Sequence, residues 1–120
     1  MATNDTCCTI QPYFKVHSGK LTEFKALCER FVERTRNEEG CLYYGWSFDG
    51  DQVHCREGYR DAAATVAHIE NVGPLVAEAV KIADVVRFEL HGPAAELDKL
   101  RGPFAAMSPQ YFTLESGFRR

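Results

Sequence analysis

The sequence predicts an α+β fold of the ferredoxin-like, split βαβ type, in which helices cover one face of an antiparallel sheet. Strand-like and helix-like segments follow one another in the order strand, helix, strand, strand, helix, strand. A hairpin signal, Asp49-Gly50, separates the two middle strands. The 120 residues, of which 45% are hydrophobic, suffice for one core. We therefore expect a single domain over residues 1–120, with a ferredoxin-like core over 6–91 and a C-terminal helix-strand extension over 92–120.

The first strand and the first helix are indicated by a change in hydrophobic period. Residues 7–16 are rich in β-branched and aromatic types and predict a strand, in which Pro12 indicates an edge position or a bulge. Ser18-Gly19 offers an N-cap for a helix that ends near Asn37, and Gly40 closes it. The apolar stripe of this helix recurs every three or four residues and consists of Leu21, Phe24, Leu27, Cys28, Phe31 and Val32.

The central hairpin decides which side chains share a face of the sheet. Its strands, residues 41–48 and 52–59, flank Asp49-Gly50-Asp51. A two-residue loop, either Asp49-Gly50 or Gly50-Asp51, keeps the same residues on one face, whereas a three-residue loop exchanges the faces. With an even loop, the shared face carries Leu42, Tyr44, Trp46, Val53 and Glu57.

The second half supplies further helices and the remaining strands. The expected elements are a helix over 62–71 capped by Asp61, a short helix over 74–83 after the break at Gly73-Pro74, a strand over 84–90, a helix over 94–100 and a strand over 111–118. A break is expected at 91–93. The sheet face that the helices leave open needs cover, and a second copy of the chain is the simplest cover. We therefore expect a homodimer of the dimeric α/β barrel type.

Composition argues against several classes of protein. The formal net charge is −3 and the basic residues are scattered, so no nucleic-acid partner is expected. No apolar run reaches the roughly 20 residues that cross a bilayer, and the start of the chain lacks a signal pattern, so we expect a cytoplasmic protein without membrane contact. The five cysteines form neither a disulfide framework nor a Cys-x-x-Cys pair. We interpret them as small buried hydrophobic residues and expect no metal site.

Two motifs carry a resemblance to a known family. Residues Glu39-Gly40-Cys41-Leu42-Tyr43-Tyr44, and after the hairpin Glu57-Gly58-Tyr59-Arg60-Asp61 followed by an Ala-rich helix with His68, resemble the antibiotic biosynthesis monooxygenase domain over about residues 8–90. The resemblance implies a reaction of dioxygen with a small aromatic molecule, without metal or organic cofactor. The chain departs from the family in the spacing at Glu38-Glu39-Gly40 and in the tail after Gly92, which can alter or close a pocket.

The candidate catalytic residues are Glu57 and His68. Glu57 shares a mostly apolar face, where a carboxylate is costly unless paired and suits a proton acceptor. The alternative is a structural Glu paired with Arg56, Arg60 or Arg87. His68 corresponds to the helical His of the family and suits proton transfer near neutral pH. A wheel centred on Ala62, Val66 and Ile69 puts it on a flank, at a cavity edge or in water.

Tyr44, Trp46 and Tyr59 are candidate substrate-binding residues, because aromatic rings with polar tips can line a pocket. Packing of the sheet is the alternative for each. The chain lacks the residue pattern of haem-degrading relatives, since His68 stands where they place a Trp. The first functional hypothesis is a cofactor-independent monooxygenase of an aromatic quinol or polyketide-like substrate. The alternative is a non-catalytic dimeric ligand-binding or stress-response protein, and a third option is an isomerase or decarboxylase with one acid–base residue.

Overall fold

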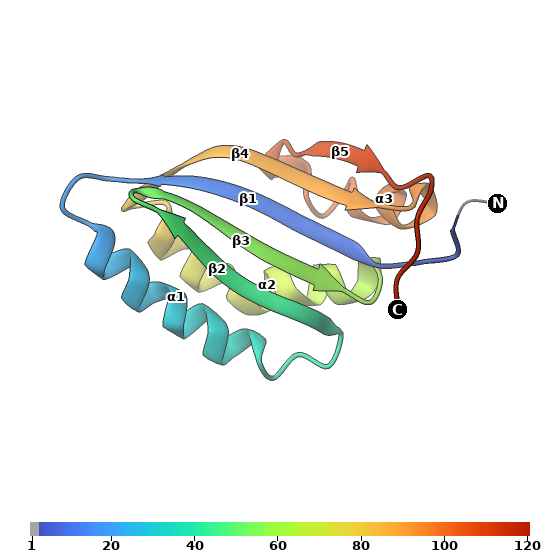
Figure 1. Ribbon diagram of the computed structural model, residues 1–120, viewed down its shortest axis with the longest axis horizontal. Helices are drawn as coiled ribbons and strands as arrows, with labels where there is room; N and C mark the ends of the chain where they lie inside the picture. The colour runs from blue at the N-terminus through green and yellow to red at the C-terminus, as the bar shows by residue number, and fades with distance from the viewer. Residues whose placement is uncertain (1–2) are drawn as a thin grey trace.

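The computed structural model describes residues 3–120, and the predicted order of strands and helices is confirmed (Figure 1). The elements are β1 (Cys8–Val16), α1 (Leu21–Thr35), β2 (Cys41–Asp49), β3 (Gln52–Tyr59), α2 (Ala62–Ala79), β4 (Ala83–Gly92), α3 (Ala94–Leu100), the 3-10 helix η1 (Ala105–Met107) and β5 (Gln110–Thr113). Residues 1 and 2, included in the predicted domain, lie outside the described residues. Within residues 3–120, no helix is long and apolar enough to cross a membrane.

The sheet has five strands in the order β2-β3-β1-β4-β5. All neighbouring pairs are antiparallel except β4 and β5, which are parallel. Helices α1 and α2 lie side by side on one face, and the other face of β1 to β4 carries no helix (Figure 1). We refer to these as the helix face and the outer face. The outer face is the one that we predict to meet a second copy of the chain.

Two hydrophobic clusters form the core on the helix face. One joins α1 and the second half of α2 to the sheet and includes Phe14, Phe24, Phe31, Val72 and Leu75. The other joins the start of α2 and α3 to the sheet and includes Ile10, Tyr59, Leu90, Leu97 and Phe104. The candidate site lies where residues of the two clusters meet.

The hairpin has an even loop, and the pairing Asp49 with Gln52 identifies the loop as Gly50-Asp51. Tyr44 is therefore opposite Glu57, and Trp46 is opposite Cys55. The register shifts between Cys41 and Tyr43, and Leu42 at this irregularity is exposed. The predicted place of Leu42 on the buried face is wrong, because the shift moves it out of the alternation that holds for the rest of the strand.

Three details near the first helix differ from the expectations. The edge position suggested by Pro12 is wrong, because β1 lies at the centre of the sheet. The bulge is confirmed by a register shift towards β4 that follows Tyr13. Lys20, not Ser18-Gly19, precedes α1, and no side chain caps the helix. Gly40 does not close the helix either: a Cβ there would lie 2.5 Å from the Cβ of Ala64, so close approach to α2 requires the glycine.

Helix α2 runs unbroken through Pro74, so the predicted division into two helices is wrong. An interior proline costs about 3 kcal/mol. Val72, Leu75 and Ala79 are almost fully buried on both sides of it, and burying a side chain of the Val or Leu type returns about 1.5–3 kcal/mol. Packing against the sheet therefore outweighs the break. The confirmed cap, Asp61, accepts a hydrogen bond from the Ala64 amide at 2.9 Å.

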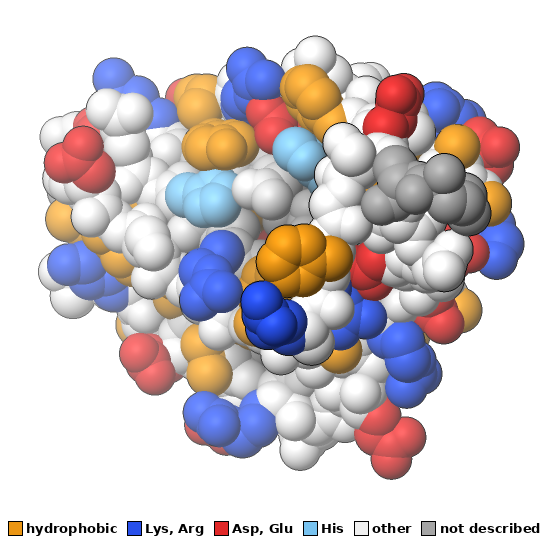
Figure 2. Space-filling view, turned by 45° about the vertical axis from the view of Figure 1, so that its right-hand side comes forward, with side chains coloured by type: hydrophobic (Ala, Val, Ile, Leu, Met, Phe, Trp, Pro, Cys, Tyr) orange, Lys and Arg blue, Asp and Glu red, His pale blue; other side chains and the backbone are white. Residues whose placement is uncertain are grey.

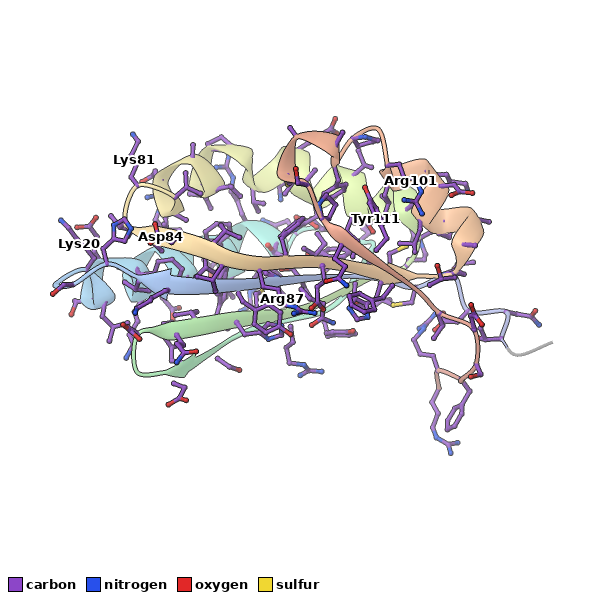
Figure 3. The ribbon with its side chains drawn as sticks, turned by 90° about the horizontal axis from the view of Figure 1, so that it is seen from above. Lys20, Lys81, Asp84, Arg87, Arg101 and Tyr111 are labelled. Atoms are coloured by element: carbon purple, nitrogen blue, oxygen red, sulfur yellow. The ribbon has the colours of Figure 1, made fainter. Side chains whose placement is uncertain are left out.

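The C-terminal extension continues the sheet of its own chain. Strand β4 reaches Gly92, two residues beyond its predicted end, and β5 is shorter than predicted. The predicted helix over 94–100 is confirmed. Arg101 lies over the ring of Tyr111 at 4.2 Å, which ties the end of α3 to β5 (Figure 3). Phe104 is buried and stacks on Phe88, so the extension packs against the core.

Candidate functional site

A cavity of about 210 Å³ lies between α2 and the helix face of the sheet. For comparison, an engineered apolar cavity of about 150 Å³ binds benzene, so the space suits one ring or an aliphatic group of similar size. Almost all of its wall is apolar. The lining residues are Ile10, Pro12, Phe14, Phe31, Tyr44, Trp46, Glu57, His68, Ile69, Val72, Val76, Ala79, Val80, Val85, Phe88 and Met107.

The cavity has an apolar rim and a polar inner end. Val80 at the end of α2, Val85 of β4 and Met107 of η1 are exposed and mark the rim. Glu57 and His68 are only 4% and 3% exposed and mark the inner end. Met107 belongs to the C-terminal extension, so the tail supplies part of the wall, as the sequence suggested it could.

Glu57 and His68 face each other from β3 and α2. The Nε2 atom of His68 lies 3.2 Å from Oε1 of Glu57. The hydroxyl of Tyr59 donates a hydrogen bond to the same oxygen at 2.5 Å. The structural partners considered for Glu57 were Arg56, Arg60 and Arg87, and none of the ion pairs within residues 3–120 joins them to it.

His68 lies at the centre of the buried face of α2, so its predicted place on a flank is wrong. The wheel was centred on Ala62, Val66 and Ile69. Apart from Ala64, the buried positions of the helix instead repeat at spacings of three and four, as Ala62, Thr65, His68, Val72, Leu75 and Ala79. Small and polar residues hide this stripe in the sequence.

Sequence reasoning missed Glu38 and Asn71. Glu38, in the loop between α1 and β2, places Oε2 2.9 Å from Nδ1 of His68. Asn71 donates from Nδ2 to the same oxygen at 2.7 Å and to the backbone oxygen of Arg34 at 3.2 Å. The signal that could have found Asn71 is its spacing of three from His68, which puts both on one side of the helix.

The imidazole of His68 is therefore held between two carboxylates. Burial alone lowers its pKa, but the hydrogen bonds and charges of Glu57 and Glu38 outweigh burial, so the pKa of His68 is raised above its ordinary value. The two carboxylates therefore favour the imidazolium form of His68 relative to a free imidazole. Burial, and then the charge of Glu57, raise the pKa of Tyr59 far above its usual range, so Tyr59 stays a neutral donor. The site thus holds an acid and a base side by side.

The three aromatic candidates have different places. Tyr44 and Trp46 line the cavity, with their rings edge to face at 6.2 Å, and the Tyr44 ring lies 5.5 Å from the ring of His68. Tyr59 is fully buried and is not among the described residues that line the cavity. Its hydroxyl group, which donates to Oε1 of Glu57, orients that carboxylate without lining the cavity itself. The Trp46 Nε1 is buried without a hydrogen-bond partner within residues 3–120, which is unusual for an indole.

Within the described part of the chain, no group of three or more His, Cys, Asp or Glu side chains could hold a metal ion. The five cysteines are free. Burial raises the pKa of the Cys8 and Cys28 thiols to about 12, so both are neutral. These two behave as the small buried residues that the sequence predicted.

Comparisons with known proteins agree with the fold. The sequence model of the family described as antibiotic biosynthesis monooxygenase matches residues 8–79. The structure is similar to the crystal structure of MupZ from Pseudomonas fluorescens, with 49% identity, a TM-score of 0.94 and coverage of 100% of this chain and 94% of that chain. The likeness to MupZ therefore includes the C-terminal extension.

More distant structures share the core. A conserved protein from Methanosarcina mazei Go1 is 22% identical, with a TM-score of 0.64 and coverage of 72% of this chain and 89% of its own. Rv0793 from Mycobacterium tuberculosis is 21% identical, with a TM-score of 0.60 and coverage of 70% and 89%. At this identity they support the fold alone. Among curated protein sequences, none matches the chain.

Proposed function

The chain belongs to the antibiotic biosynthesis monooxygenase family, and from this premise we propose that it is an enzyme that moves protons on a largely apolar small molecule. The reaction that we assign first is cofactor-independent oxygenation of an aromatic quinol or polyketide-like substrate. The observation that carries the proposal is the Glu57–His68 pair, buried at the inner end of an apolar cavity. An acid and a base next to each other in a dry site suit proton transfer.

The roles follow from the contacts. Glu57 accepts the proton of a substrate hydroxyl, and the resulting anion reduces dioxygen and forms a carbon–oxygen bond with it at a ring carbon that bears hydrogen. His68 protonates the peroxide, and then takes the proton from that ring carbon as the oxygen–oxygen bond breaks. The ring carbon becomes a carbonyl, and the hydroxide that departs takes the proton held by Glu57 and leaves as water. The substrate furnishes all the electrons, and both residues return to their starting forms. Tyr44 and Trp46 contact the ring, and the apolar wall excludes water.

Oxygen uptake tests this reaction. The protein is incubated with each member of a panel of hydroquinones, naphthols and anthrones under isotopically labelled dioxygen. The mass of each product is measured by mass spectrometry. We expect one dioxygen consumed and one labelled oxygen retained per product. Glu57→Gln is expected to lower kcat by about 10²–10⁴-fold. Glu70→Gln, on the exposed side of α2, is the matched control and should change it less than twofold.

Two other outcomes have a definite meaning. Ligand binding without conversion of any substrate by folded protein rejects the oxygenase for the panel and supports a non-catalytic ligand-binding protein. Conversion that continues without dioxygen supports an isomerase or another acid–base enzyme instead. Of these two alternatives, the structure favours the isomerase or other acid–base enzyme. The pKa of His68 is raised, and an imidazolium 3.2 Å from a carboxylate also serves reactions in which only protons move.

A further inference from the structure

Glu38 contacts His68 on the side that faces away from Glu57. Its carboxylate lies 3.1 Å (Oε1) and 2.9 Å (Oε2) from Nδ1, whereas Nε2 faces Glu57. Glu57 lines the cavity, and Glu38 is not among the described residues that do so. Glu38 is therefore out of reach of a molecule in the cavity and can act there only through His68.

We propose that Glu38 is a positioning residue: it fixes the imidazole of His68 in one orientation, with a hydrogen on each ring nitrogen and Nε2 directed at Glu57. The proposal deepens the proposed function and rests on it. Without Glu38, a rotated ring would direct carbon atoms at Glu57 at little cost. With Glu38 in place, only one orientation lets both nitrogens reach a carboxylate.

Glu38 is itself held in place. Asn71 donates to its Oε2 at 2.7 Å and also to the backbone oxygen of Arg34 at the end of α1. Because Asn71 and His68 lie on the same helix, one side of α2 presents both the imidazole and the amide that orients its partner. The loop before β2 is thereby fixed relative to α2.

Glu38 has more access to water than Glu57. Its side chain is 12% exposed and borders a separate surface hollow beside Thr35, Cys41 and Tyr44. The side chain of Glu57 is 5% exposed and faces the cavity. The two carboxylates that contact His68 therefore lie in different surroundings, and only that of Glu57 borders the cavity.

The groups that face His68 come from three segments. Glu38 comes from the loop before β2, Tyr44 from β2, and Glu57 and Tyr59 from β3, with the Tyr59 ring 4.8 Å from the imidazole. Burial is the main cause that raises the pKa of both phenols, so they stay neutral. The negative charges that act on His68 therefore come from the two carboxylates, Glu38 and Glu57.

The test measures His68 directly. Glu38→Gln, Glu38→Asp and the control Glu39→Gln are titrated by NMR of the His68 ring, and the pH profile of kcat is recorded in parallel. Glu39 is the exposed neighbour of Glu38. An opposite charge at this range raises a pKa by about 1–3 units, so Glu38→Gln should lower the pKa of His68 by about one unit or more. We expect kcat to fall about tenfold at unchanged KM, Glu38→Asp to recover part of both effects, and Glu39→Gln to change neither.

Each outcome separates the two proposals. A folded Glu38→Gln protein whose His68 titrates as in the unchanged protein overturns the positioning role, whatever its activity. A shifted titration without any turnover in the parent protein keeps the positioning role and rejects the proposed enzyme. If Glu38→Gln does not fold, Asn71→Ala, which frees Glu38 but keeps its charge, should shift the titration in the same direction, and no shift there overturns the proposal.

Discussion

A buried glutamate next to a histidine occurs on both faces of the sheet, at Glu57 on the helix face and at Glu89 on the outer face. Glu89 is 6% exposed and lies 2.8 Å from Nε2 of His91. It also binds Arg87, which points away from the helices (Figure 3). A buried carboxylate with an imidazole partner is thus common to the two regions, and such a pair alone does not define a site.

The difference lies in what surrounds each pair. The partners of Glu89 are half-exposed, with side chains of Arg87 and His91 at 53% and 39%, and the His91 ring stacks on Phe112. His68, the partner of Glu57, is buried, contacts a second carboxylate and borders a cavity. On the face shown in Figure 2, basic and acidic side chains are interspersed without a continuous patch of either charge. Enclosure and a cavity, more than residue types, distinguish the candidate site.

Removing the histidine should separate the two faces most strongly. His68→Ala leaves Glu57 and Glu38 without their cation in a buried place, and breaking a buried pair costs about 3–5 kcal/mol. His91→Ala removes a half-exposed partner of Glu89, and such pairs are worth about 0–1 kcal/mol. Urea unfolding followed by circular dichroism measures both. Equal losses would mean that enclosure does not distinguish the pairs.

Filling the space next to the pair should affect the helix face alone. Val76→Phe replaces an isopropyl group by a phenyl ring in the cavity wall that Ile69 and Val72 also line. The ring takes up space that the substrate needs, so we expect KM for a converted substrate to rise about tenfold. Val86→Phe, at an exposed position of β4 outside that wall, is the matched control. Steady-state kinetics and the molecular mass of the protein in solution, which reports its oligomeric state, are recorded for both variants. An unchanged KM in folded Val76→Phe would place the substrate elsewhere.

The sequence was sufficient for most of the fold and for half of the site. Glu57, Tyr44 and Trp46 were assigned to one face because strand alternation and an even hairpin loop leave little freedom. Glu38 was not found, because it lies in an irregular loop whose path depends on Gly40 meeting Ala64, a contact without local periodicity. His68 was misplaced for a related reason: Thr65 and His68 are buried by position rather than by hydrophobicity, so an apolar stripe does not mark them.

Long-range packing decided the other differences. Pro74 interrupts a helix in isolation, but the sheet holds residues on both sides of it. Pro12 indicates an edge position or a bulge, and the bulge that follows Tyr13 lets a central strand accept it. At Pro74, by contrast, contacts with residues distant in sequence outweigh the local rule. The homodimer stays a prediction.

The smallest expected effect is a difference in how the two faces respond to pH. The folded pKa of His68 is raised, so its stabilisation is complete below the unfolded value near 6.5 and is lost as pH rises through the folded pKa. The pKa of Glu89 is lowered: burial raises it, but His91 and Arg87 outweigh burial. Its stabilisation is present above the unfolded value near 4.5 and is lost as pH falls through the folded pKa. Unfolding free energies of His68→Gln and Glu89→Gln are measured against the parent from well below pH 4.5 to well above pH 6.5. His68→Gln should converge with the parent at the high end of this range, and Glu89→Gln at the low end. Convergence at the same end would show that the two carboxylate–histidine pairs titrate alike, and the contrast between the faces would then rest on the cavity alone.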